Sequence, residues 1–346
     1  MKILLLIDDY DNIKHNNHRL VSNAIVRAQH DLHLGSINSV SYRHGAVHAA
    51  ATRVPRCLEV GDDFADKLTD QRIDDMDLIW VMNQPHPSIL LDTYQLLWLL
   101  EGRCRFVNSV SSFIFVNNKS VLEAVVGVDH IPETHVASDF ASLWEQFQRD
   151  GGDWIVKPPN DGCGTDVYRL SPQDSNAKVI LESMTGNTYP QYSMKNPRML
   201  GFVGRYCVMQ RYVAAASRGE KRVVIAGGEV IASYLRTNRT GDHRSNRIHG
   251  AEQQVCELTD SEKRLCNSLG RMLLGLGVTF TAIDMVYPYL FELNIINPGG
   301  LIVYERLTGK DLSDLALEKI LTALDFPVTR PATGVLAQFQ ELRAGD

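Results

Sequence analysis

The chain lacks the usual marks of a secreted, membrane-spanning or nucleic-acid-binding protein. Its six cysteines include no C-x-x-C pair, which in a chain of this length favours reduced thiols. No apolar run approaches the roughly 20 residues needed to cross a bilayer. The formal net charge of −6 argues against binding of nucleic acid over a broad basic surface. We therefore expect a cytoplasmic protein with no nucleic-acid and no membrane partner.

Familiar catalytic signatures are missing as well. The sequence shows no Ser-His-Asp or Cys-His arrangement, no Walker A motif and no convincing set of metal-binding histidines. The composition is ordinary for a globular protein, with 44% apolar and 22% charged residues. At 346 residues the chain is long enough for two or three domains, each with a buried core.

The clearest chemical pattern lies in residues 278–301. Two apolar runs flank a Tyr-Pro-Tyr turn and predict a hairpin whose strands are buried on at least one face. Residues two apart on a strand share a face, so Glu292 and Asn294 lie on one side, where Asp284 can face them. Two carboxylates and an amide oxygen suit Mg²⁺. The alternative is an edge hairpin with two solvated acids.

Strands and helices alternate over the first hundred residues. Strands are predicted at Lys2–Ile7 and Asp77–Met82, and helices at His18–His30 and Ser88–Leu100. This alternation indicates an open α/β sheet with ligand sites at the strand ends. Asn83–Pro87 follows one of these strands directly, so it is either a substrate loop or a plain connecting turn.

A second unit begins near Asn108 and contains a candidate phosphate site. Lys157 lies in a predicted strand, which is followed by the glycine-bearing loop 159–166 and a return strand. Glycines let backbone N–H groups approach phosphate oxygens, while the lysine supplies a point charge. The same Asn-Asp-Gly sequence is also common in ordinary turns.

A third unit begins near Arg205 and includes the polar, basic segment 236–250. This segment holds four arginines and two histidines and almost no apolar residues. Two interpretations stay open. One is a solvated loop, and the other is an anion clamp, because arginine binds carboxylates and phosphates in two-point geometry.

Taken in chain order, these parts resemble the ATP-grasp superfamily, and the bacterial glutathione synthetase branch most closely. A lysine precedes a strand–glycine loop–strand unit, an apolar strand contains Gln210, and a D…E-x-N pattern ends the series. The resemblance covers about residues 75–325. The stretches that carry it are Asn108–Leu122, Trp154–Leu170, Val208–Val213, Gly219–Val230, Arg244–Gly250 and Ala282–Pro298.

The resemblance implies a role for each matching residue. The residues implied for ATP are Lys119, Lys157, Gly162, Gly164, Gln210, Arg211, Tyr212, Val213 and Glu220. Those implied for the acyl phosphate and the substrate carboxylates are Arg222, Arg236, Arg244 and Asn246. The implied Mg²⁺ ligands are Asp284, Glu292 and Asn294. The implied substrate loop contains Asn297, Gly299 and Gly300.

The fold implied is the α/β ATP-grasp fold, with nucleotide bound between its last two domains. The expected division is an N-terminal α/β domain at 1–108 and a small lid domain at 109–204. A C-terminal α+β domain with the metal site follows at 205–330, and a tail occupies 331–346.

The activity implied is ATP-dependent ligation of a carboxylate to an amine through an acyl phosphate. This chemistry needs positioning and charge neutralisation rather than a nucleophilic side chain. The expected cofactors are ATP and Mg²⁺, with Mn²⁺ as an alternative. The expected partners are small carboxylate and amine substrates, such as an amino acid or short peptide, and a homo-oligomer stays open.

Two segments depart from the family pattern. Residues 82–85 stand where glutathione synthetases usually carry a basic and acidic stretch, and residues 297–301 stand where they usually have Ser-Pro-Thr. These departures put γ-glutamylcysteine and glycine in doubt as the substrates. Two alternatives therefore remain: a ligase that adds amino acids to a peptide or protein terminus, and an inactive nucleotide-binding protein.

Overall fold

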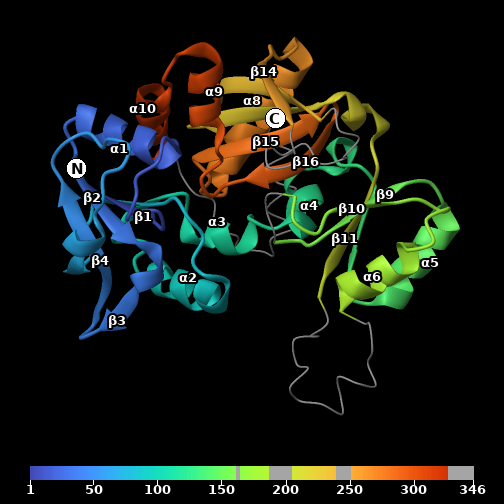
Figure 1. Ribbon diagram of the computed structural model, residues 1–346, viewed down its shortest axis with the longest axis horizontal. Helices are drawn as coiled ribbons and strands as arrows, with labels where there is room; N and C mark the ends of the chain where they lie inside the picture. The colour runs from blue at the N-terminus through green and yellow to red at the C-terminus, as the bar shows by residue number, and fades with distance from the viewer. Residues whose placement is uncertain (161–163, 187–204, 239–250, 326–346) are drawn as a thin grey trace.

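The computed structural model describes residues 1–160, 164–186, 205–238 and 251–325. Within these residues the principal strands form three sheets, which lie one after another along the molecule (Figure 1). No helix among them is long and apolar enough to cross a bilayer. The described cysteines are all free thiols.

The first sheet is mixed and has the strand order β3-β4-β2-β1-β6-β7, with β5 paired to β4. Its centre is parallel, because β1 pairs in parallel with both β2 and β6. The strands are β1 (Lys2–Ile7), β2 (Asp31–Ser36), β3 (Ser41–Arg43), β4 (Ala46–Val54), β5 (Thr69–Arg72), β6 (Leu78–Val81) and β7 (Arg105–Val107). The accompanying helices are α1 (Asn17–Arg27) and α2 (Leu90–Trp98).

The second sheet has the order β10-β9-β11-β8 and lies far from the first sheet in Figure 1. Its strands are β8 (Thr134–Ala137), β9 (Trp154–Lys157), β10 (Tyr168–Leu170) and β11 (Cys207–Arg211). Helices α5 (Phe140–Asp150) and α6 (Ala177–Thr185) belong to this unit, which we call the lid. Helices α3 (Val110–Phe115) and α4 (Leu122–Val126) precede it.

The third sheet has the order β14-β13-β12-β15-β16, and all its pairings are antiparallel. Its strands are β12 (Glu220–Ala226), β13 (Glu229–Thr237), β14 (Glu252–Val255), β15 (Phe280–Val286) and β16 (Tyr289–Asn294). Its helices are α8 (Asp260–Gly275), α9 (Gly300–Thr308) and α10 (Ser313–Ala323).

The first and third sheets share their apolar cores, whereas the lid has a core of its own. Leu4 and Ile79 belong to the same buried cluster as Val223 and Ile283. On β12, Val224 and Ala226 point into a different cluster from Val223 and Ile225, which is the alternation expected of a strand buried on both faces. The lid cluster is separate and includes Trp154.

Asn108 joins the first sheet to the third. Its buried side chain donates hydrogen bonds of 2.7 Å to the carbonyl oxygens of Phe280 and Ile295. Its amide oxygen accepts from the backbone N–H groups of Thr279 and Phe280, at 2.7 and 2.8 Å. One amide therefore satisfies four backbone groups that would otherwise be buried without partners.

The predicted α/β alternation and the 278–301 hairpin are confirmed. The expected boundary at residue 205 does not coincide with a sheet boundary, because β11 hydrogen bonds to β8 and β9 of the lid. Strand order depends on hydrogen bonds between distant segments, which an apolar run does not reveal. We therefore propose that the lid extends through Arg211. The expected tail at 331–346 lies outside the described residues.

Candidate active site

The acidic hairpin places its polar residues on one face of the third sheet. Asp284 on β15 lies directly opposite Glu292 on β16, and Ala282 lies opposite Asn294. Directly opposed residues of an antiparallel pair project to the same side, and so do residues two apart. Asp284, Glu292 and Asn294 therefore share a face, as predicted from the sequence. Asn294 Nδ2 lies 3.4 Å from Asp284 Oδ2.

Two arginines from neighbouring strands hold the Asp284 carboxylate. Arg222 on β12 lies opposite Asp284 in the sheet, and its Nε and Nη2 donate to the two carboxylate oxygens at 2.6 Å each. Arg236 on β13 adds a contact of 2.7 Å to Oδ1. All three side chains are buried. Charge-assisted, two-point pairing of this kind is the strong form of the arginine–carboxylate interaction.

Burial and the arginines act on the Asp284 carboxyl in opposite directions. Burial raises its pKa, but Arg222 and Arg236 outweigh burial and bring the pKa down to about 2. The carboxylate is therefore ionised at neutral pH. Glu220 on β12 is ion-paired with Arg236, and burial raises its pKa despite that arginine.

Two lysines from outside the third sheet contact its strand β16. Lys119 Nζ lies 2.9 Å from Glu292 Oε1. Lys157 at the end of β9 donates to Gln210 Oε1 at 3.0 Å and to the carbonyl oxygen of Phe291 at 3.3 Å. Burial, together with the nearby charge of Lys119, lowers the Lys157 pKa to about 8. The lid sheet and the third sheet thus meet at a cluster of cations and carboxylates.

Of the residues implied for ATP, Gln210 and Arg211 lie on opposite faces of β11. Gln210 faces Lys157 and also donates to Thr134 Oγ1 at 2.9 Å. Arg211 points the other way, with its guanidinium 3.7 Å from the centre of the Trp154 ring, and it pairs with Glu133 at 2.8 Å. The Tyr212 ring is covered by Arg169. Of these side chains, only Gln210 contacts one of the two lysines.

A cavity of about 440 Å³ opens on the charged face. Of the sequence-predicted residues, it is lined by Lys119, Arg222, Arg236, Glu292, Asn294, Asn297 and Gly299. Met82, Asn83 and Gln84 line it as well, so the first part of the 83–87 segment borders the cavity. Asn117 and Asn118 also line the cavity and were not singled out in the sequence, although they directly precede Lys119, which was the available signal. Asn160, also in the lining, belongs to the predicted phosphate loop 159–166.

The two substrate-loop glycines serve different purposes. Gly299 precedes α9 with a φ of +78°, a conformation that favours glycine, and lines the cavity. At Gly300 a Cβ atom would lie 2.1 Å from Val224 Cγ2. Gly300 therefore lets α9 pack closely against β12. Gly299 lines the cavity, whereas Gly300 does not.

The donor set on the hairpin fits Mg²⁺. Asp284 and Glu292 supply carboxylate oxygens and Asn294 supplies an amide oxygen, which are the hard ligands that Mg²⁺ prefers. All three lie on one face, and the low pKa of Asp284 keeps its carboxylate ionised. Gly162, Arg244 and Asn246, also predicted for the site, lie outside the described residues, and Gly164 is not among the residues that line the cavity.

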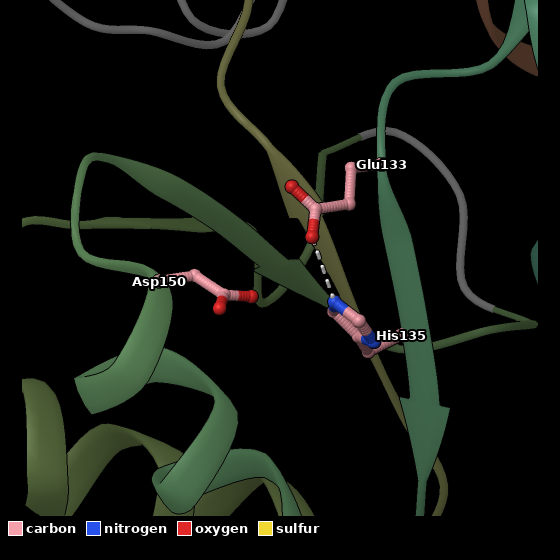
Figure 2. Close-up of side chains that lie close together, drawn as sticks. All are labelled: Glu133, His135 and Asp150. Carbon is pink, nitrogen blue, oxygen red and sulfur yellow. Dashed lines mark hydrogen bonds and ion pairs between the residues drawn. The ribbon is translucent and has the colours of Figure 1, made fainter.

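A second group of metal-ligand side chains lies in the lid, away from the cavity. Glu133, His135 and Asp150 bring their ligand atoms within 4.8 Å of one another (Figure 2). Glu133 Oε2 is paired with Arg211, and Asp150 Oδ1 accepts from Arg149 at 3.2 Å. These arginines compensate the charge of both carboxylates. The three side chains are therefore explained by ion pairs at the lid surface, without a metal ion.

Comparison with known proteins identifies the relatives of this chain. Residues 122–309 match the family model of the prokaryotic glutathione synthetase ATP-grasp domain. Glutathione synthetase of Gloeobacter violaceus is 27% identical, over 96% of this chain and 98% of the relative. Glutathione synthetase of Prochlorococcus marinus subsp. pastoris is 30% identical, over 70% of this chain and 74% of the relative.

Solved structures agree on the fold. D-cycloserine synthetase DcsG superposes with a TM-score of 0.62 at 12% identity, covering 93% of this chain and all of the neighbour. The ATP-grasp ligase PsnB, solved with a minimal precursor, gives a TM-score of 0.59 at 13% identity over 93% of this chain and 98% of the neighbour. At these identities the likeness concerns the fold alone, and it is the fold predicted from the sequence.

Proposed function

Because this chain belongs to the prokaryotic glutathione synthetase family of ATP-grasp ligases, it is an ATP-dependent ligase that forms an amide bond, and we propose that its acid substrate is a small polar amino acid or short peptide bound in the cavity beside Arg222 and Arg236. The observation that supports this substrate class is the cavity lining. Besides Lys119, Glu292 and the two arginines, the polar part of the lining consists of amide side chains, namely Asn83, Gln84, Asn117, Asn118, Asn160, Asn294 and Asn297. Amides both donate and accept hydrogen bonds, which suits peptide-like groups.

The residues on the charged face have distinct roles in this proposal. One carboxylate oxygen of the acid attacks the γ-phosphorus of ATP, so that ADP leaves and an acyl phosphate forms. In this proposal Lys119 and Lys157, which contact Glu292 and Gln210, neutralise phosphate charge, and Arg222 and Arg236, which line the cavity, orient the acid. The amine then attacks the acyl carbon, phosphate leaves, and the nitrogen loses a proton.

Mg²⁺, which ATP-grasp ligases use together with ATP, would be held by Asp284, Glu292 and Asn294. When bound, it supplies charge neutralisation at the phosphoryl oxygens. Arg222 and Arg236 fix the orientation of the Asp284 carboxylate. Charge that is held in place in this way requires little rearrangement during the reaction.

We further propose that γ-glutamylcysteine and glycine are a poor substrate pair. Where the family pattern has Ser-Pro-Thr, the side chain of Asn297 is bonded to Asn17 and His18, and Gly299 has no side chain. Hydroxyl groups that the family pattern would offer a polar substrate are therefore missing, and an unpaired polar group can cost several powers of ten in discrimination.

Release of ADP, measured against a panel of amino acids, dipeptides and γ-glutamyl peptides, tests both proposals. We expect turnover with at least one polar acid, and a kcat/KM for γ-glutamylcysteine with glycine well below about 10⁴ M⁻¹s⁻¹, the lower end of the ordinary range. A value in the ordinary range would make this a plain glutathione synthetase. Absence of ADP release with every acid would contradict the proposed substrate class.

A further inference from the structure

Two segments of the cavity wall, far apart in sequence, meet the same helix. The first is the end of β6 with Met82–Gln84, and the second is the segment Asn297–Gly299. Both segments depart from the family pattern. The N-terminal end of α1 lies against both of them, although it does not itself line the cavity.

Asn17 links α1 to the second segment through two hydrogen bonds. Its Nδ2 donates to Asn297 Oδ1 at 2.9 Å, and its Oδ1 accepts from the backbone N–H of Ile302 at 2.9 Å. The side chain is only 2% exposed, so neither bond competes with bulk water. Asn17 thereby fixes both the side chain that begins the segment and the first turn of α9.

His18 connects the two segments to each other. Its Nε2 lies 3.0 Å from Asn297 Nδ2, and the ring also hydrogen bonds to the backbone of Met82. Burial lowers its pKa, although the Met82 bond opposes that shift, so the ring is neutral at pH 7. A neutral imidazole has one acceptor and one donor nitrogen. With Nε2 accepting from the Asn297 amide, Nδ1 is left to donate to the Met82 carbonyl, and Nδ1 also lies 3.3 Å from Asn16 Nδ2.

The second segment begins with a residue in the left-handed region. Asn297 has a φ of +43°, which is uncommon for a residue other than glycine. Helix α1 packs through Leu20, Val21 and Ile25 into the core, and Arg27 at its other end pairs with Asp311 and with Asp314 of α10. The cavity wall is therefore built against a helix that is anchored in the core.

We propose that Asn17 and His18 are positioning residues, which hold Asn297 and the Met82 end of β6 in place and thereby set the affinity of the cavity for its acid substrate. This inference rests on the proposed function, since it places an acid in this cavity. Neither residue touches the acid. Both act through the two segments that do.

The test compares Asn17→Ala and His18→Leu with Asn23→Ala as a matched control. Asn23 is also a buried asparagine of α1 and also makes two bonds to another segment, with Leu58 N–H at 2.6 Å and the Leu58 carbonyl at 3.2 Å, but it lies away from the cavity. His18→Gln keeps a donor and an acceptor, and it serves as the conservative variant.

Acid activation is measured with hydroxylamine as the amine, which converts the acyl phosphate into a hydroxamate and releases phosphate. The probe acid is the member of the amino-acid and peptide panel that the wild type activates best. We expect Asn17→Ala and His18→Leu to raise the KM for this acid by about 10- to 100-fold, the scale of a displaced substrate-positioning group. The KM for ATP should be unchanged, Asn23→Ala should change neither constant, and His18→Gln should recover part of the loss.

Hydrogen exchange on the ligand-free protein gives a second readout that needs no substrate. The Ile302 amide should exchange faster in Asn17→Ala than in Asn23→Ala at equal global stability. An unchanged acid KM, or an equal rise in the control, would overturn the proposal. If the wild type activates no acid, the proposed function fails instead, and the exchange comparison alone then decides whether α1 anchors this segment.

Discussion

Asp284 is both a buried ion-pair partner and the central member of the proposed metal set. Replacing it with Asn leaves Arg222 and Arg236 buried with less compensation, and breaking a buried pair costs about 3–5 kcal/mol. We expect Asp284→Asn to abolish turnover and to lower the free energy of unfolding by about 3 kcal/mol. Urea unfolding and ADP release measure the two effects.

Glu292→Gln is the matched variant within the same proposed metal set. Its side chain is 27% exposed and pairs with Lys119 alone among the described ion pairs. It should therefore lose most of the turnover with little loss of stability. Near-normal ADP release in the Asp284→Asn, Glu292→Gln double variant would contradict the metal assignment.

Lys157 gives a prediction for the dependence of stability on pH. Its pKa of about 8 in the folded protein lies below the ordinary 10.5, so between these values the unfolded chain binds more protons and stability rises with pH. The free energy of unfolding of the ligand-free wild type should therefore rise relative to Lys157→Met from pH 8 to pH 10. A constant difference between the two proteins would show that the Lys157 pKa is not lowered. The variant should also bind ATP more weakly.

At the scale of secondary-structure elements, the seating of α9 depends on one glycine. A Cβ at residue 300 would meet Val224 at 2.1 Å, and overpacking of this kind costs about 1–3 kcal/mol. Gly300→Ala should destabilise the protein, and Val224→Ala in the same molecule should relieve part of that cost. The coupling is measured by a double-mutant cycle in urea.

Gly309, at the other end of α9, provides the control. It has a φ of +72° and open space around its Cα, so Gly309→Ala introduces backbone strain without a clash. Val224→Ala should leave that strain unrelieved. Equal coupling of both glycines to Val224 would rule out the steric explanation.

Sequence periodicity was sufficient for the hairpin at 278–301 but not for the contacts between distant segments. The shared face of Asp284, Glu292 and Asn294 follows from alternation within one hairpin, and it was predicted correctly. The pairing of Asp284 with Arg222 depends on a register between strands 62 residues apart, which no local pattern contains. The contact of Asn17 with Asn297 spans 280 residues, so no spacing in the sequence points to it.

At the scale of the whole molecule, the separate core of the lid predicts separate opening. The lid cluster around Trp154 shares no member with the clusters that join the first and third sheets. Units with their own cores often open independently of the global transition. Amides of β9 and β11 should therefore exchange at lower urea concentrations than those of β1 and β15. Coincident exchange of all four strands would show a single cooperative unit.

The hydrogen bonds of Asn108 bear on which parts of this ligase can be interchanged with those of another. Any N-terminal unit grafted in front of the third sheet would have to bring an amide to the same place, or leave four buried backbone groups of residues 279, 280 and 295 without partners. The lid carries its own core, and the chain enters it near residue 133 and leaves it near residue 212. Modular recombination is therefore expected to tolerate exchanged lids and to reject exchanged N-terminal units.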